Sequence, residues 1–67
     1  MSAEEMRKFC QSIHPYELRV QVHLKDRSAG VFFGKITHVE NEQFQIVTDE
    51  KVVKSLRFSW VARIRNA

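Results

Sequence analysis

Residues 18–25 read Leu-Arg-Val-Gln-Val-His-Leu-Lys, with an apolar side chain at every second position. Successive side chains of a β-strand point to opposite faces of the sheet, so this alternation predicts a strand with one buried and one solvated face. The stretch comes shortly after Pro15, and the apolar residues before Pro15 recur at helical spacing instead. The change of period at Pro15 therefore divides the chain into a helical start and a β-rich remainder.

Residues 2–13 have the pattern of an amphipathic helix. Ser2 and Glu5 stand at the spacing of a capping box. An apolar stripe follows at positions i, i+3, i+4 and i+7: Met6, Phe9, Cys10 and Ile13. We expect His14-Pro15 to end the helix, because the residue before a proline is disfavoured in helical conformation. A helix this short is marginal in water, so its stripe is expected to pack against the rest of the chain.

Four more strands are expected after the first, separated by polar breaks, at residues 31–40, 44–48, 52–58 and 62–65. Short strands at such spacing are typical of a small antiparallel barrel, whose closure removes exposed sheet edges. Gly34 stands in the middle of a strand, where glycine permits a sharp bend or a close backbone approach. The predicted fold is mainly β: a helix over residues 2–13 and a strongly bent, five-stranded antiparallel barrel over residues 17–66, forming one domain, 1–67.

Composition places the chain among small basic proteins. Eleven Lys and Arg against eight Asp and Glu give a formal charge of +3. A chain of 67 residues buries only about 60% of its unfolded surface, so additional stabilisation by self-association is expected. Cys10 is the only cysteine and is predicted to be a buried reduced thiol, with an intermolecular disulfide or a reactive thiol as alternatives. Neither a membrane span nor a signal peptide is visible, so we expect a cytoplasmic location.

Three segments resemble the Sm-like family, which includes the Sm proteins and the bacterial host-factor RNA chaperone. Residues 20–26, Val-Gln-Val-His-Leu-Lys-Asp, are similar to its first strand and turn. Residues 34–40, Gly-Lys-Ile-Thr-His-Val-Glu, are similar to its strand-two signature, and residues 58–64 occupy the place of its second motif. The resemblance implies an Sm-like or SH3-like small barrel, and a ring in which strand four of one copy pairs with strand five of the next. Glu40 and Ser59-Trp60 depart from the family's uridine-binding residues, so the resemblance implies the barrel and the ring more directly than the uridine pocket.

The alternating pattern turns most basic side chains toward the solvated side of the strands, whereas the acidic ones gather at strand ends and turns. Basic strand faces are suited to phosphate contacts. The alternative is that these charges only keep the surface solvated. The candidate nucleic-acid-binding residues are Arg19, His23, Lys25, Lys35, Arg57, Trp60, Arg63 and Arg65.

The aromatic residues leave several roles open. Trp60 is predicted either to lie in the core, to anchor a subunit interface, or to stack on a nucleobase. Phe32 and Phe33 are adjacent, so one belongs to the core and the other needs a cover from the helix, a second subunit or a ligand. This surplus of apolar surface favours self-association through candidate interface residues Phe33, Phe58 and Trp60.

The chain contains no glycine-rich phosphate loop, nucleophile elbow or His-Glu-x-x-His element, and its histidine spacings match no zinc pattern. We therefore expect no enzymatic activity, cofactor, metal or small-molecule substrate. The leading hypothesis is an oligomer that binds RNA, in single-stranded form. The alternatives are a protein-interaction or scaffold barrel and, more remotely, a duplex-DNA or chromatin-associated one.

Overall fold

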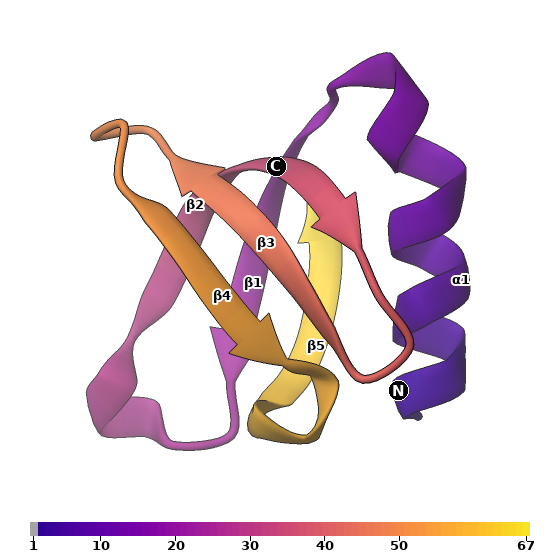
Figure 1. The fold of residues 1–67 in the computed structure, drawn as a ribbon. Coiled ribbons are helices and arrows are strands. Elements are labelled where there is room, and N and C mark those ends of the chain that lie inside the picture. The colour runs from indigo at the N-terminus through magenta and orange to yellow at the C-terminus, as the bar shows by residue number, and fades with distance from the viewer. Residues whose placement is uncertain (1) are drawn as a thin grey trace.

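The computed structural model describes residues 2–67 and places one helix before five strands, as the sequence predicts (Figure 1). Each helix or strand ends within about one residue of its predicted limit. Two short 3-10 helices, η2 (Arg27–Ala29) and η3 (Phe58–Trp60), precede the second and the last strand. The other elements are α1 (Ala3–Ile13), η1 (His14–Tyr16), β1 (Arg19–Leu24), β2 (Val31–Val39), β3 (Gln43–Thr48), β4 (Val53–Arg57) and β5 (Val61–Asn66).

Helix α1 begins with the predicted capping box. The Glu5 backbone N–H donates to Ser2 Oγ at 3.1 Å, and the Ser2 N–H donates to Glu5 Oε1 at 3.3 Å. Three residues of the apolar stripe, Met6, Cys10 and Ile13, are buried against the sheet. The helix therefore forms part of the core. Within residues 2–67, no helix has both the length and the apolar character needed to cross a bilayer.

Pro15 was expected to keep His14 out of the helical conformation, and this expectation is wrong. His14 keeps helical dihedral angles (φ −51°, ψ −45°), and the chain continues through η1. Pro15 stands in the first turn of η1, where a missing N–H leaves no hydrogen bond unmade. The chain leaves the helical conformation only at Glu17, which is left-handed with φ 53°. The His14 Nε2 donates to the Thr37 carbonyl oxygen at 2.7 Å and so ties η1 to β2.

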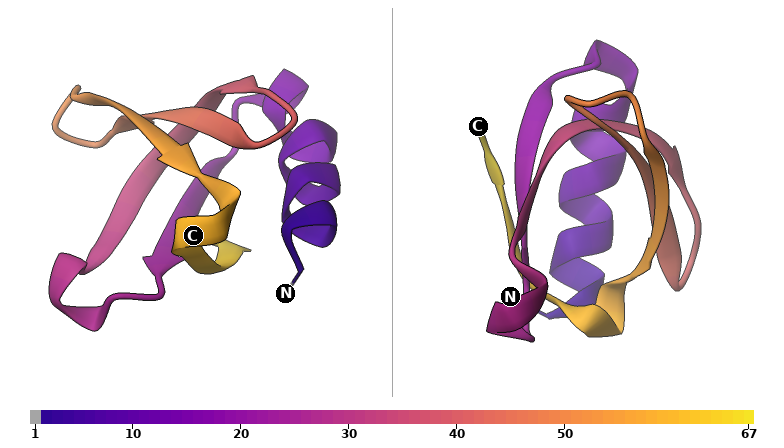
Figure 2. Two further views of the ribbon diagram at one scale, coloured as in Figure 1. Left: turned by 60° about the horizontal axis from the view of Figure 1, so that its bottom comes forward. Right: turned by 90° about the vertical axis from the view of Figure 1, so that its left-hand side faces the viewer.

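The five strands form one antiparallel sheet in the order β4-β3-β2-β1-β5. Figure 2 shows that the sheet curves strongly, so that β3 and β4 turn over the core while α1 lies across one end. β4 and β5 are the two edges and do not pair with each other. The predicted five strands and antiparallel pairing are confirmed, but the sheet of a single chain is open, so the predicted closure into a barrel is absent.

The open edges carry backbone groups that have no partner strand. Hydrogen bonds from the Thr48 N–H to the Val52 oxygen and from the Phe58 N–H to the Glu42 oxygen fix the phase of the β3–β4 ladder. Hydrogen-bonded and non-hydrogen-bonded pairs alternate along an antiparallel ladder. Because Ser55 lies opposite Gln45 at a non-hydrogen-bonded position, its N–H and C=O point away from β3. Val53 and Arg57 also occupy non-hydrogen-bonded positions, so their N–H and C=O groups point away from β3 as well.

Gly34 supplies the close approach that its position predicts. It lies opposite Thr48 on β3, and a Cβ atom there would be 2.8 Å from the Thr48 Cα and nearer still to the Val47 carbonyl oxygen. Any side chain at position 34 would push β2 and β3 apart. Glycine is therefore required here by space.

The core lies between the curved sheet and α1. The rings of Phe44 and Phe58 pack with their centroids 5.0 Å apart. The one buried polar side chain among the described residues, Thr48, accepts a hydrogen bond from the Val52 N–H. The buried apolar residues are Met6, Cys10, Ile13, Val20, Val22, Ile36, Phe44, Ile46, Leu56, Phe58, Val61 and Ile64.

Candidate nucleic-acid interface

Strands β1 and β5 bring a group of basic side chains to the outer face of the sheet. His23 is paired with Arg63, and Gln21 with Arg65. Paired residues direct their side chains to the same face, and alternate residues direct theirs to the opposite one. Val22 and Ile64, the pair between these two, are buried in the core. His23, Arg63 and Arg65 therefore share the outer face, and we call these three residues the β1–β5 basic face.

His23 is held in place within this group. Its Nε2 donates to Gln21 Oε1 at 2.8 Å, and the Gln21 amide donates to the Asn66 carbonyl oxygen at 3.4 Å. Desolvation lowers the pKa of His23 below its ordinary value, and the charges of Arg63 and Arg65 lower it further. The lowered pKa favours the neutral imidazole at neutral pH, and acidification adds the charge.

Neither arginine of the face forms an ion pair within residues 2–67. In the part of the protein that the structure describes, ion pairs join Lys8 to Glu4 and Arg19 to Asp49. Arg63 and Arg65 belong to neither and are exposed. Their guanidinium groups are therefore available to an external anion, such as a phosphate, that accepts paired N–H bonds.

Trp60 is the last residue of η3 and immediately precedes β5. Its side chain is 51% exposed, so the prediction of a core tryptophan is wrong. The Trp60 carbonyl oxygen accepts a 2.9 Å hydrogen bond from the Lys25 N–H, which places an exposed lysine beside it. Five of the predicted residues thus lie on β1 or β5 or directly beside the ends of these strands: His23, Lys25, Trp60, Arg63 and Arg65.

Arg19 points outward as predicted, but it is not a free cation. Its Nε lies 3.2 Å from both carboxylate oxygens of Asp49, and its Nη2 also donates to Asp49. The pair lowers the pKa of Asp49, chiefly through the side-chain hydrogen bond. The guanidinium carbon also lies 5.0 Å from the centre of the Phe33 ring. Lys35 is paired with Arg19 across β1 and β2, so it lies with Arg19 and not with the β1–β5 basic face.

Two other predicted residues lie apart from the β1–β5 basic face. Arg57 ends β4, on the opposite edge of the sheet, where it lines a hollow with Asn41 and Glu42. Phe58 is only 2% exposed and packs on Phe44, so it has no surface to offer and its assignment to an interface is wrong. It begins η3, and the chain buries Phe58 while turning Trp60 outward.

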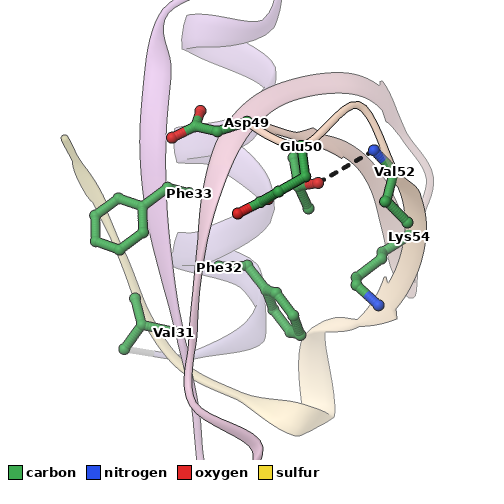
Figure 3. A pocket seen from close by; sticks show the side chains of 8 residues that line it. Val31, Phe32, Phe33, Asp49, Glu50, Val52 and Lys54 are labelled. Carbon is green, nitrogen blue, oxygen red and sulfur yellow. Dashed lines mark hydrogen bonds between the residues drawn. The ribbon is translucent and has the colours of Figure 1, made fainter.

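The adjacent phenylalanines separate as predicted. Figure 3 shows Phe33 and Val31 pointing out of the sheet, while Phe32 points the other way, toward Lys54. The Lys54 Nζ lies 5.1 Å from the Phe32 ring centre and covers it at the mouth of a hollow of about 370 Å³. The sequence analysis missed this lysine. The signal was present, since Lys54 stands two residues before the buried Leu56 and so faces the same side.

No protein-family model matches the chain, and no curated protein matches it either.

Proposed function

We propose that this protein is a non-enzymatic, Sm-like module that assembles through its sheet edges and binds single-stranded RNA on the β1–β5 basic face. The observation that carries the proposal is that Arg63 and Arg65 lie on the edge strand β5, which the exposed Trp60 immediately precedes. Arg63 and Arg65, which form no ion pair among the residues that the structure describes, can neutralise neighbouring phosphates, and the indole can stack on a base of any sequence.

Assembly is supported by the two open edges. β4 and β5 are both unpaired on one side, and a long exposed edge is a template for another strand. Pairing β4 of one copy with β5 of the next would leave no edge open in a closed ring. The outer face of a sheet continues across such a junction. Arg57 on β4 would then stand on the same side as the neighbour's arginines and extend the basic surface.

Binding to RNA is tested by titrating a fluorescent, single-stranded oligouridylate at increasing salt. Each phosphate contact with a single strand contributes a slope of about −0.7 to the dependence of log affinity on log salt. We expect Arg63→Glu and Arg65→Glu each to weaken binding about tenfold or more and to flatten this slope. Lys8→Glu makes the same change of charge on the exposed side of α1 and is the control, with binding close to wild type.

Stacking is tested with Trp60→Ala in the same assay. Loss of one base stack costs about 1–3 kcal/mol, with little change in the salt slope because no charge is removed. Affinity that ignores salt, or that survives both arginine substitutions, would reject the basic face as the RNA site.

A second candidate function is a protein-interaction or scaffold module. It is favoured by large apolar side chains left exposed, with Tyr16 at 74% and Val53 at 61%. In that case oligouridylate would not bind, whereas Trp60→Ala or Phe33→Asp would change the assembly state seen by light scattering.

A further inference from the structure

We propose that His23 makes phosphate binding by the β1–β5 basic face proton-dependent: neutral His23 leaves two arginines to hold the anion, and protonated His23 adds a third cation. The inference rests on the proposed function and adds its regulation. It starts from the place of His23 on the outer face, directly opposite Arg63 on β5.

The hydrogen bonds of the ring define what protonation changes. Nε2 donates to Gln21 Oε1, so in the neutral ring Nδ1 is an acceptor. An acceptor repels a phosphate oxygen. On protonation Nδ1 becomes a donor with a positive charge, while the bond to Gln21 is kept. One proton therefore turns His23 from a neutral neighbour of the anion into a ligand for it.

The charged groups around His23 determine whether protonation strengthens or weakens phosphate binding. On β1 its neighbour on the same face is Gln21, the exposed Lys25 follows the end of the strand, and β2 places the apolar Val31 opposite it. β5 contributes Arg63 and Arg65, and no carboxylate faces the ring from these three strands. The inner side of the strands belongs to the core, so α1 brings no charge to this face.

Desolvation, together with the charges of Arg63 and Arg65, lowers the pKa of His23 and favours the neutral ring while the face is empty. A bound phosphate supplies the missing negative charge and stabilises the imidazolium. By linkage, the anion raises the proton affinity of His23 and the proton raises the affinity for the anion by the same factor. Binding should therefore strengthen as the pH falls through the pKa of His23.

The first experiment measures the affinity for oligouridylate between about pH 8 and about pH 5 at constant ionic strength, a range in which histidine titrates but uracil does not. We expect wild-type affinity to rise roughly threefold to tenfold on acidification, the range of one partly exposed charge pair. The salt slope should steepen by about 0.7 for the added phosphate contact. His23→Gln should bind oligouridylate with an affinity that does not rise between about pH 8 and about pH 5. His38→Gln removes another exposed histidine of β2 and should keep the full rise.

The second experiment follows the ring protons of His23 by NMR during pH titrations in chloride and in sulfate of equal ionic strength. Sulfate is used as a tetrahedral dianion that does not titrate in this range. We expect sulfate to raise the pKa of His23.

The outcomes separate the two proposals. A pH-independent wild-type affinity, or a rise that persists in His23→Gln, would overturn the role of His23 and leave RNA binding intact. Absence of oligouridylate binding together with a sulfate-dependent shift at His23 would support the proton-linked anion site and reject RNA as its ligand. An unchanged His23 titration in sulfate would overturn the inference whatever the RNA result.

Discussion

Cys10 has no solvent-exposed surface, although it lies on a helix only eleven residues long. Burial raises the pKa of its thiol to about 12. Because the thiolate is the reactive form, a thiol with this pKa is almost fully protonated and unreactive near pH 8. We expect an aromatic disulfide reagent at that pH to label the native protein far more slowly than the urea-unfolded chain.

Since Cys10 is the only cysteine, every labelling event reports this position. The labelling rate should rise with urea in parallel with loss of structure measured by circular dichroism. Rapid modification under native conditions would contradict a buried structural thiol and favour a reactive one. A disulfide-linked dimer on a non-reducing gel would favour the intermolecular disulfide instead.

At single positions, the sequence predicted which face of the sheet a side chain occupies better than it predicted which residue that side chain contacts. Alternation places Arg19 on the outer face, and it is there. Its neutralisation by Asp49 follows from the sheet, which brings residues thirty positions apart into contact. The burial of Phe58 and the exposure of Trp60 depend on η3, whose turn interrupts the two-residue alternation between β4 and β5. A strand pattern extended through these residues would give the wrong face.

At the scale of elements, Gly34 is the position where β2 and β3 tolerate no side chain. Gly34→Ala would place a methyl group against the Val47 carbonyl and the Thr48 Cα. Backbone atoms in a sheet cannot rotate away as a side chain can, so we expect a loss of at least about 2 kcal/mol in the free energy of unfolding. Urea denaturation measures it.

Ser55→Ala, an exposed substitution on β4, is the control for this measurement and should stay within about 0.5 kcal/mol of wild type. A Gly34→Ala protein with an unchanged urea midpoint would show that the strands can separate at this point without cost. Both strands and their pairing follow from the sequence pattern, whereas the closeness at Gly34 depends on the register. In the sequence, the glycine is the one feature that indicates this close approach of β2 and β3.

For the whole molecule, the period change after Pro15 was enough to predict one helix and five antiparallel strands. It was not enough to predict whether the sheet closes. Closure depends on whether β4 and β5 pair with each other in one chain, and here they are the two unpaired edges of the sheet. A sequence pattern reports which side of a strand is dry but carries no information on which strand lies beyond the edge.

The open edges lead to a prediction about the assembled protein. Ser55 directs its backbone N–H away from β3, into the free edge of β4. Proline at an edge position removes a donor needed by an incoming strand without breaking the existing ladder. If copies associate by pairing β4 with β5, Ser55→Pro should yield a folded monomer, whereas wild type should be an oligomer. Light scattering coupled to gel filtration gives the mass, and circular dichroism checks that the fold is kept.

Ser55→Ala is matched to this variant, because it makes a similar change of side chain and retains the N–H. It should assemble like wild type, so any difference between the two variants belongs to the backbone donor. A monomeric wild-type protein would contradict assembly altogether. An oligomer that persists in Ser55→Pro would assign the contact to another surface, and the exposed apolar side chains of Phe33 and Trp60 would then be the next to substitute.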